Sequence, residues 1–178
     1  IVFGDACRLG YAGVVVHRDG NGDLSTTLLQ SRWESGGALD YGHSTISEPE
    51  AAVRLLHATS QLHRGAHTIY VTDHAPFVSA HERGYSIAPH YNSCVGRILD
   101  RHPEAFLVFQ PGETMVADKY SRFEASTLTV EDREAAEASA AAIFGGNMGE
   151  TAHGCDVGSI WGEVRIKSRR DGCPHWIA

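Results

Sequence analysis

Ile1-Val-Phe-Gly-Asp-Ala-Cys7 is the first of three runs of strand-forming residues that open the chain, and it is followed by Tyr11-Ala-Gly-Val-Val-Val-His17 and Leu24-Ser-Thr-Thr-Leu-Leu-Gln-Ser-Arg32. β-Branched and apolar residues dominate these runs. Turn signals separate them, at Arg8-Leu-Gly10 and at Asp19-Gly-Asn-Gly-Asp23. Consecutive strands joined by short turns predict an antiparallel meander.

The next hundred residues alternate between helical and strand patterns. Apolar residues recur at helical spacing in the longest segment, and two short apolar runs have the length of buried strands. The expected helices are 44–62, 74–82, 90–101 and 113–122, and the expected strands are 68–72 and 105–109. This order predicts an α/β fold with a mixed five-stranded sheet, three antiparallel meander strands plus parallel strands, flanked by helices.

Residues 124–178 differ in texture from the part before them. An Ala-rich segment, 130–144, predicts a helix that docks through its Ile143-Phe144 end, and a Gly-rich loop and a strand at 160–166 are expected after it. We therefore divide the chain into a first domain, 1–123, and a C-terminal extension, 124–178.

Two features of the extension have alternative interpretations. A zinc site is one interpretation of four residues, but their one-residue gaps are tighter than usual ligand spacings, which favours ordinary buried cysteines. These residues are His153, Cys155, Cys173 and His175. The basic residues Lys167, Arg169 and Arg170 either contact phosphates or form a solvated turn.

Length and composition limit the class of protein. A chain of 178 residues is long enough for one well-cored domain. Four scattered cysteines, no secretory signal and no apolar run long enough for a membrane span favour an intracellular protein, cytoplasmic or in a nuclear particle. The chain opens inside a strand, as expected of a piece of a longer polypeptide. Its net charge of −7 argues against tight, self-sufficient nucleic-acid binding but not against divalent-cation ligands.

Four carboxylates stand where separate elements begin or end. Asp5 and Asp73 end strands, Glu48 lies at the start of a helix, and Asp118 lies in the last helical segment of the first domain. Alone, each has an ordinary role in a turn, a helix cap or a solvated face. Carboxylates gathered from several elements, however, are the ligands that hard cations require.

The helix that carries Glu48 offers a second candidate, Glu50. Ser47-Glu-Pro-Glu50 fits a capping box, which makes Glu50 the capping residue and Glu48 the ligand. Pro49 is unusual inside a helix, and a small shift in register would exchange the two roles. Glu50 therefore stays open as the alternative.

Four motifs make residues 1–123 resemble the ribonuclease H domain of retroelement reverse transcriptases. The likeness is greatest to the domains of LTR (gypsy-like) and tyrosine-recombinase-type retrotransposons and of hepadnavirus polymerases. In chain order the motifs are Asp5-Ala-Cys-Arg-Leu-Gly-Tyr11, Glu48-Pro-Glu-Ala-Ala-Val-Arg-Leu-Leu56, Val71-Thr-Asp-His74 and Pro111-Gly-Glu-Thr-Met-Val-Ala-Asp-Lys-Tyr-Ser-Arg122. Their joint order and spacing carry the resemblance, and the last motif is the most specific.

The resemblance implies a ribonuclease H-like fold and an endoribonuclease that cuts the RNA strand of RNA–DNA hybrids with two Mg²⁺ ions, for which Mn²⁺ can substitute. Asp5 would bridge both ions, Glu48 and Asp73 would complete one shell, and Asp118 would hold the other ion. His74, Arg8 and Arg122 are the expected substrate contacts. A preceding reverse transcriptase domain is the expected partner, and no membrane is involved.

The sequence departs from the family at two places. His74 stands where Asn is common, and residues 110–117 contain no His, although many cellular members carry one there. The acidic net charge and His74 give some weight to the alternative of a catalytically weak or inactive ribonuclease H-like scaffold in a larger polymerase or nucleoprotein complex, but the presence of all four carboxylates favours the active enzyme. A transposase or integrase of the same fold class fits less well, because its Glu follows the second Asp, whereas Glu48 precedes Asp73.

Overall fold

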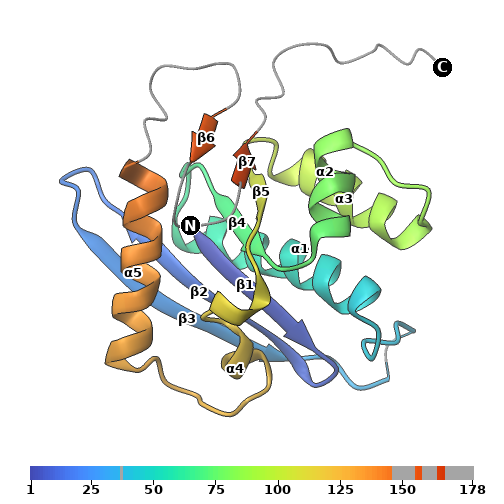
Figure 1. The fold of residues 1–178 in the computed structure, drawn as a ribbon. Helices are drawn as coiled ribbons and strands as arrows, with labels where there is room; N and C mark the ends of the chain where they lie inside the picture. Colours follow the sequence, from blue (N-terminus) through green and yellow to red (C-terminus); the bar gives the residue numbers. More distant parts are fainter. Residues whose placement is uncertain (37, 146–154, 158–163, 167–178) are drawn as a thin grey trace.

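The computed structural model describes residues 1–36 and 38–145, together with the backbone of two short strands, 155–157 and 164–166 (Figure 1). The strands are β1 Val2–Cys7, β2 Gly10–Arg18, β3 Leu24–Arg32, β4 Ile69–Thr72, β5 Phe106–Phe109, β6 Cys155–Val157 and β7 Val164–Ile166. The helices are α1 Ser44–Leu62, α2 Ala75–Arg83, α3 Pro89–Arg101, the 3-10 turn η1 Gly112–Thr114, α4 Asp118–Ser121 and α5 Val130–Gly145.

The main sheet has five strands in the order β3-β2-β1-β4-β5. β1 is antiparallel to β2 and parallel to β4, which is in turn parallel to β5. The predicted mixed sheet of meander and parallel strands is therefore confirmed. Val2 pairs with Tyr70 and Phe3 with Val71, so the same register carried two residues further brings Asp5 level with Asp73.

Helices cover both faces of this sheet (Figure 1). Alternate residues of one strand point to opposite faces. Val2 therefore packs in the core beneath α1, α2 and α3, while its neighbour Phe3 packs in the core beneath α4 and α5. Burial on both faces explains why Val14-Val-Val16 is continuously apolar rather than alternating.

Helix α5 belongs to the core of the sheet. Ala136 and Ala140 are fully buried in the same cluster as Phe3. Thr26 of β3 donates a hydrogen bond of 2.5 Å to Glu137, and the Arg18 guanidinium lies 4.2 Å from the centre of the Phe144 ring. The predicted docking of the Ala-rich helix is thus confirmed, and this part of the extension shares one core with residues 1–123.

Ala136→Asp is expected to destabilise the protein by about 3 kcal/mol, because it places an uncompensated charge in a closed apolar contact. Ala135→Asp, on the exposed face of the same helix, is the matched control and should change stability by less than about 0.5 kcal/mol. Urea unfolding followed by circular dichroism measures both. Equal effects of the two substitutions would show that α5 is not packed on the sheet in solution.

The predicted helix over 113–122 is wrong in its middle. The chain forms the 3-10 turn η1, becomes extended at Met115, and forms the short helix α4 only from Asp118. The Gln110 side chain holds this break by donating hydrogen bonds to the carbonyl and hydroxyl oxygens of Thr114, at 2.8 and 2.9 Å. Met115 is buried in the core, which stabilises the extended backbone at that position.

The predicted capping box is also wrong. Helix α1 begins at Ser44, with His43 as its N-cap, so Ser47 lies within the first turn. The Ser47 hydroxyl donates to the carbonyl of His43, at 3.2 Å. Pro49 lies inside the helix, and Glu50 is free to act elsewhere.

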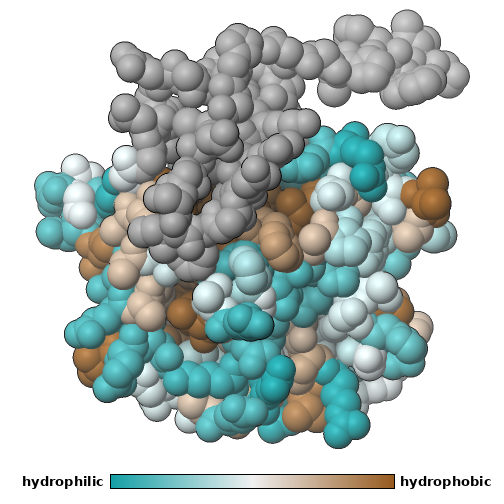
Figure 2. Space-filling view, viewed as in Figure 1, coloured by the Kyte–Doolittle hydropathy of each residue, from teal (hydrophilic) through white to brown (hydrophobic). Residues whose placement is uncertain are grey.

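On the coloured part of the face shown in Figure 2, hydrophobic residues are scattered among hydrophilic ones. No helix in the described ranges has the length and apolarity that a membrane crossing requires.

The possible zinc ligands and the basic run of the extension lie outside the residues whose side chains the structure describes. They are His153, Cys155, Cys173, His175, Lys167, Arg169 and Arg170.

Candidate metal centre

Three of the four predicted carboxylates come together where β1 and β4 end beside the start of α1. Asp5, Glu48 and Asp73 each offer one oxygen, and these oxygens all lie within 4.8 Å of one another. We call these three residues the acidic cluster. They come from three separate elements, so only the folded chain brings them together.

Asp5 lies at the buried side of the cluster, and the residue is 6% exposed. The Ser121 hydroxyl donates a hydrogen bond to Asp5 Oδ2. Burial raises the pKa of Asp5 to about 6, and the negative charges of Asp118 and Asp73 add to this, while the Ser121 hydrogen bond opposes it. Without a cation, the fold therefore disfavours the ionised form of Asp5.

Glu48 is as deeply buried as Asp5. Its Oε1 accepts a hydrogen bond of 3.1 Å from the backbone N–H of Ala6, which fixes the side chain against β1. Its Oε2 is buried without a hydrogen-bond partner among the described residues. Burial, followed by the charges of Asp5 and Asp73, raises the pKa of Glu48 well above its usual value. A buried carboxylate oxygen with no donor is costly, and a bound cation would remove that cost.

Asp73 forms the exposed side of the cluster. It lies against the backbone of the loop that follows β5: a Cβ placed on Gly112 would be only 2.7 Å from Asp73 Oδ2. Glycine at position 112 therefore leaves room for the Asp73 carboxylate in its present position, which a larger residue would displace.

Asp118 lies at the edge of the cluster rather than inside it. Its Oδ1 accepts a hydrogen bond of 2.7 Å from the Arg122 guanidinium, one helical turn away. Its charge nevertheless contributes to the raised pKa of both Asp5 and Glu48. The Arg122 predicted to contact substrate thus holds the fourth predicted ligand.

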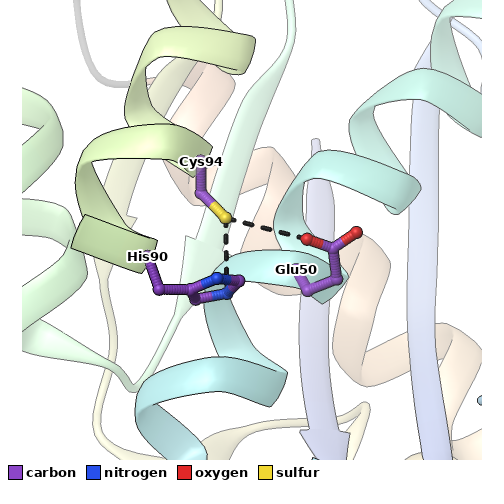
Figure 3. Close-up of side chains that lie close together, drawn as sticks. All are labelled: Glu50, His90 and Cys94. Carbon is purple, nitrogen blue, oxygen red and sulfur yellow. Dashed lines mark hydrogen bonds between the residues drawn. The ribbon is translucent and has the colours of Figure 1, made fainter. Parts of the chain in front are cut away.

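Glu50, the alternative to Glu48, points to a different place. It contributes to a second group with His90 and Cys94 of α3, whose possible ligand atoms also lie within 4.8 Å of one another (Figure 3). Arg97 donates hydrogen bonds of 2.7 and 3.2 Å to the two Glu50 oxygens, and Arg54 adds one of 3.4 Å. These arginines lower the pKa of Glu50 although burial alone would raise it.

The second group is less suited to a cation than the acidic cluster. Burial, with the negative charge of Glu50 as the next cause, raises the pKa of the Cys94 thiol to about 12, so Cys94 stays protonated. Two guanidinium groups already neutralise Glu50 and would repel an incoming cation. The structure therefore separates the two glutamates: Glu48 lies in the acidic cluster, and Glu50 is an ion-pair residue between α1 and α3.

His74, a predicted substrate contact, lies next to Asp73 at the start of α2. Its Nε2 is 2.5 Å from the Tyr91 hydroxyl oxygen. Burial lowers the pKa of His74, and the charge of Asp73 opposes that effect. Burial, and then the charge of Glu48, raise the pKa of Tyr91. Arg8, the remaining predicted contact, is exposed in the turn between β1 and β2.

Sequence reasoning missed two residues of the site: Ser121, which donates to Asp5, and Tyr91, which contacts His74. Ser121 belongs to the last motif, so the sequence drew attention to this residue, but nothing in the sequence predicted its hydrogen bond to Asp5. Tyr91 gave no signal of its own, because its place on the apolar face of α3 suggests only an ordinary core residue.

The donor set of the acidic cluster fits a hard divalent cation such as Mg²⁺ or Mn²⁺. Its ligands are carboxylate oxygens, which these ions prefer, and Glu48 Oε2 has no hydrogen-bond partner among the residues that the structure describes. Comparison with protein-family models, curated proteins and solved structures finds no match for this chain. The argument for function consequently rests on the motifs and on this geometry.

Proposed function

We propose that this chain has a ribonuclease H-like fold and is a metal-dependent endoribonuclease that cleaves the RNA strand of RNA–DNA hybrids as part of a retroelement reverse transcriptase. The observation that carries the proposal is the acidic cluster, whose three carboxylates are those singled out by the motifs. The sheet order, with a meander followed by two parallel strands, is compatible with that fold.

The residues of the cluster have distinct tasks in this proposal. Bound Mg²⁺ or Mn²⁺ ions would supply an activated water and charge stabilisation for in-line displacement at the phosphodiester. The Ser121 hydroxyl orients Asp5, and the Ala6 N–H orients Glu48. Asp73, on the exposed side, faces the substrate. Asp118 would join the site after leaving Arg122, and that arginine would then be free to pair with a phosphate.

Substrate selection in this proposal depends on the RNA strand. Contacts to 2′-hydroxyls across the shallow minor groove distinguish RNA from DNA, and in this proposal His74, beside Asp73, would make one. Arg8 and Arg122 would contact phosphates. Because the net charge of the chain is −7, we expect weak binding of the hybrid by this chain alone, with a neighbouring domain supplying the basic surface.

A cleavage assay tests the proposal. The protein is incubated with end-labelled RNA–DNA hybrid, duplex DNA and duplex RNA, in Mg²⁺, in Mn²⁺ and in EDTA. We expect cleavage of the RNA strand of the hybrid alone, with 5′-phosphate and 3′-hydroxyl ends, and no cleavage in EDTA. Equal cutting of all three substrates, or cutting that survives EDTA, would contradict the assignment.

The Arg122–Asp118 ion pair favours a second candidate, an inactive scaffold domain of the same fold, because it keeps the fourth carboxylate out of the cluster. A scaffold would bind Mn²⁺ weakly or not at all and would leave the hybrid uncut. Isothermal titration with Mn²⁺, run alongside the cleavage assay, distinguishes the two candidates.

A further inference from the structure

The side chain of Tyr70 ends directly behind the acidic cluster. Tyr70 lies in β4, three residues before Asp73, and is fully buried. Its hydroxyl lies against Gly4, the residue before Asp5, so closely that a Cβ placed on Gly4 would overlap it. Glycine at position 4 is thus the condition for a tyrosine at position 70.

The Tyr70 hydroxyl has no hydrogen-bond partner among the described residues, although it is completely buried. A buried hydroxyl without a partner costs about 1–3 kcal/mol. Phenylalanine would fill the same apolar core without that cost, so packing does not explain the hydroxyl. A hydrogen-bond partner that forms only when metal is bound would explain why this position carries a hydroxyl.

Glu48 is the candidate for that partner. Glu48 Oε2 is itself buried and unpartnered. After burial, the charge of Glu48 is the largest cause of the raised pKa of Tyr70, ahead of Asp5 and Asp73. The phenol therefore stays protonated and is a hydrogen-bond donor, while an ionised Glu48 accepts only.

We propose that Tyr70 is a positioning residue whose hydroxyl donates a hydrogen bond to Glu48 when the acidic cluster holds a divalent cation. This inference rests on the proposed function, because it assumes that the cluster binds metal. The Tyr70 hydroxyl and Glu48 Oε2 are two buried polar groups without a hydrogen-bond partner among the described residues, and a bond between them would satisfy both. With a cation on the cluster, the Tyr70 donor would fix the orientation of the ligating Glu48 carboxylate. Ligating carboxylates commonly have such partners, whose loss lowers metal affinity about 10–100-fold.

Tyr70→Phe is the test, with Tyr120→Phe as its control. Tyr120 is also fully buried, but its hydroxyl already donates to Asp132, on the other face of the sheet. The affinity for Mn²⁺ is measured by isothermal titration, and the stability of the metal-free protein by urea unfolding. We expect Tyr70→Phe to weaken Mn²⁺ binding about 10–100-fold while leaving metal-free stability equal or higher. Tyr120→Phe should lower stability and keep the affinity for Mn²⁺.

The possible results separate this inference from the proposed function. If the unmodified protein binds Mn²⁺ and Tyr70→Phe binds it equally well, Tyr70 has no positioning role and the proposed function stands. If both variants weaken binding to the same degree, the effect is a general loss of packing and the inference fails. If the unmodified protein binds no Mn²⁺, the proposed function fails and the inference fails with it.

Discussion

Glu48→Gln is expected to abolish hybrid cleavage, whereas Glu50→Gln retains it. Glu48 lies in the acidic cluster, and one of its oxygens has no partner in the described part of the chain, while Glu50 binds Arg97 on the other side of α1. Loss of a metal-ligating carboxylate removes several kcal/mol of transition-state stabilisation, which is about a thousandfold or more in rate. Initial rates on labelled hybrid at saturating Mg²⁺ measure the difference.

The effects of these two substitutions on stability should be the reverse of their effects on activity. Burial, and then the charges of Asp5 and Asp73, disfavour the ionised form of Glu48, so replacing this carboxyl with the neutral Gln should leave the metal-free protein as stable as the unmodified protein or more stable. Glu50→Gln weakens ion pairs to Arg97 and Arg54, whose side chains are 36% and 29% exposed, and should cost about 1–2 kcal/mol. If Glu50→Gln loses activity and Glu48→Gln keeps it, the roles are reversed.

The metal-free protein is expected to lose stability as the pH rises from about 4 to about 6.5, because of Asp5. Burial raises the pKa of Asp5 from an ordinary 3.8 to about 6, so the folded state holds this proton more tightly than the unfolded state does. The resulting stabilisation is complete below pH 4 and is lost as the pH rises through 6. A difference of about two pKa units corresponds to about 3 kcal/mol.

Asp5→Asn should remove this part of the pH dependence and make the metal-free protein more stable at pH 7. Saturating Mn²⁺ should raise the melting temperature of the unmodified protein at that pH, since a ligand at a hundredfold excess over its Kd contributes about 2.7 kcal/mol. Asp5→Asn should lose most of that rise. The control is Asp100→Asn, an exposed carboxylate in α3, which should change neither quantity. Thermal unfolding from pH 4 to 8, with and without Mn²⁺, measures both the pH dependence and the stabilisation by Mn²⁺. An unmodified protein whose melting temperature responds to neither pH nor Mn²⁺ would contradict a preformed cation site.

Local patterns were enough to predict most elements of the fold. The strand runs that begin at Ile1, Tyr11 and Leu24 correspond to β1, β2 and β3, and the helix predicted over 44–62 matches α1. These predictions succeed because burial on one or both faces imposes a period on the sequence. The break at Met115 was not predictable in this way, because it depends on the Gln110 side chain and on the core that receives Met115.

The candidate site was also predictable only in part from the sequence. The motifs named Asp5, Glu48, Asp73 and Asp118, but only the fold shows that the first three converge while Asp118 is held by Arg122. The choice between Glu48 and Glu50 also depended on tertiary structure. Two residues apart on one helix, they point in directions about 200° apart, so one reaches β1 and the other reaches α3.

By itself, the sequence determined the α/β class, the order of the elements and the residues able to act as metal ligands. These features depend on hydrophobic periodicity and side-chain chemistry, which short stretches of sequence contain. Tertiary structure alone decided which carboxylates share one site, that the Tyr70 hydroxyl is buried with no partner among the described residues, and that Ser121 binds Asp5. These facts depend on the parallel register of β1 and β4 and on the packing of α1 and α4 against them. Contacts between residues as far apart as 5 and 121 are set by packing of the whole core, which no local pattern specifies.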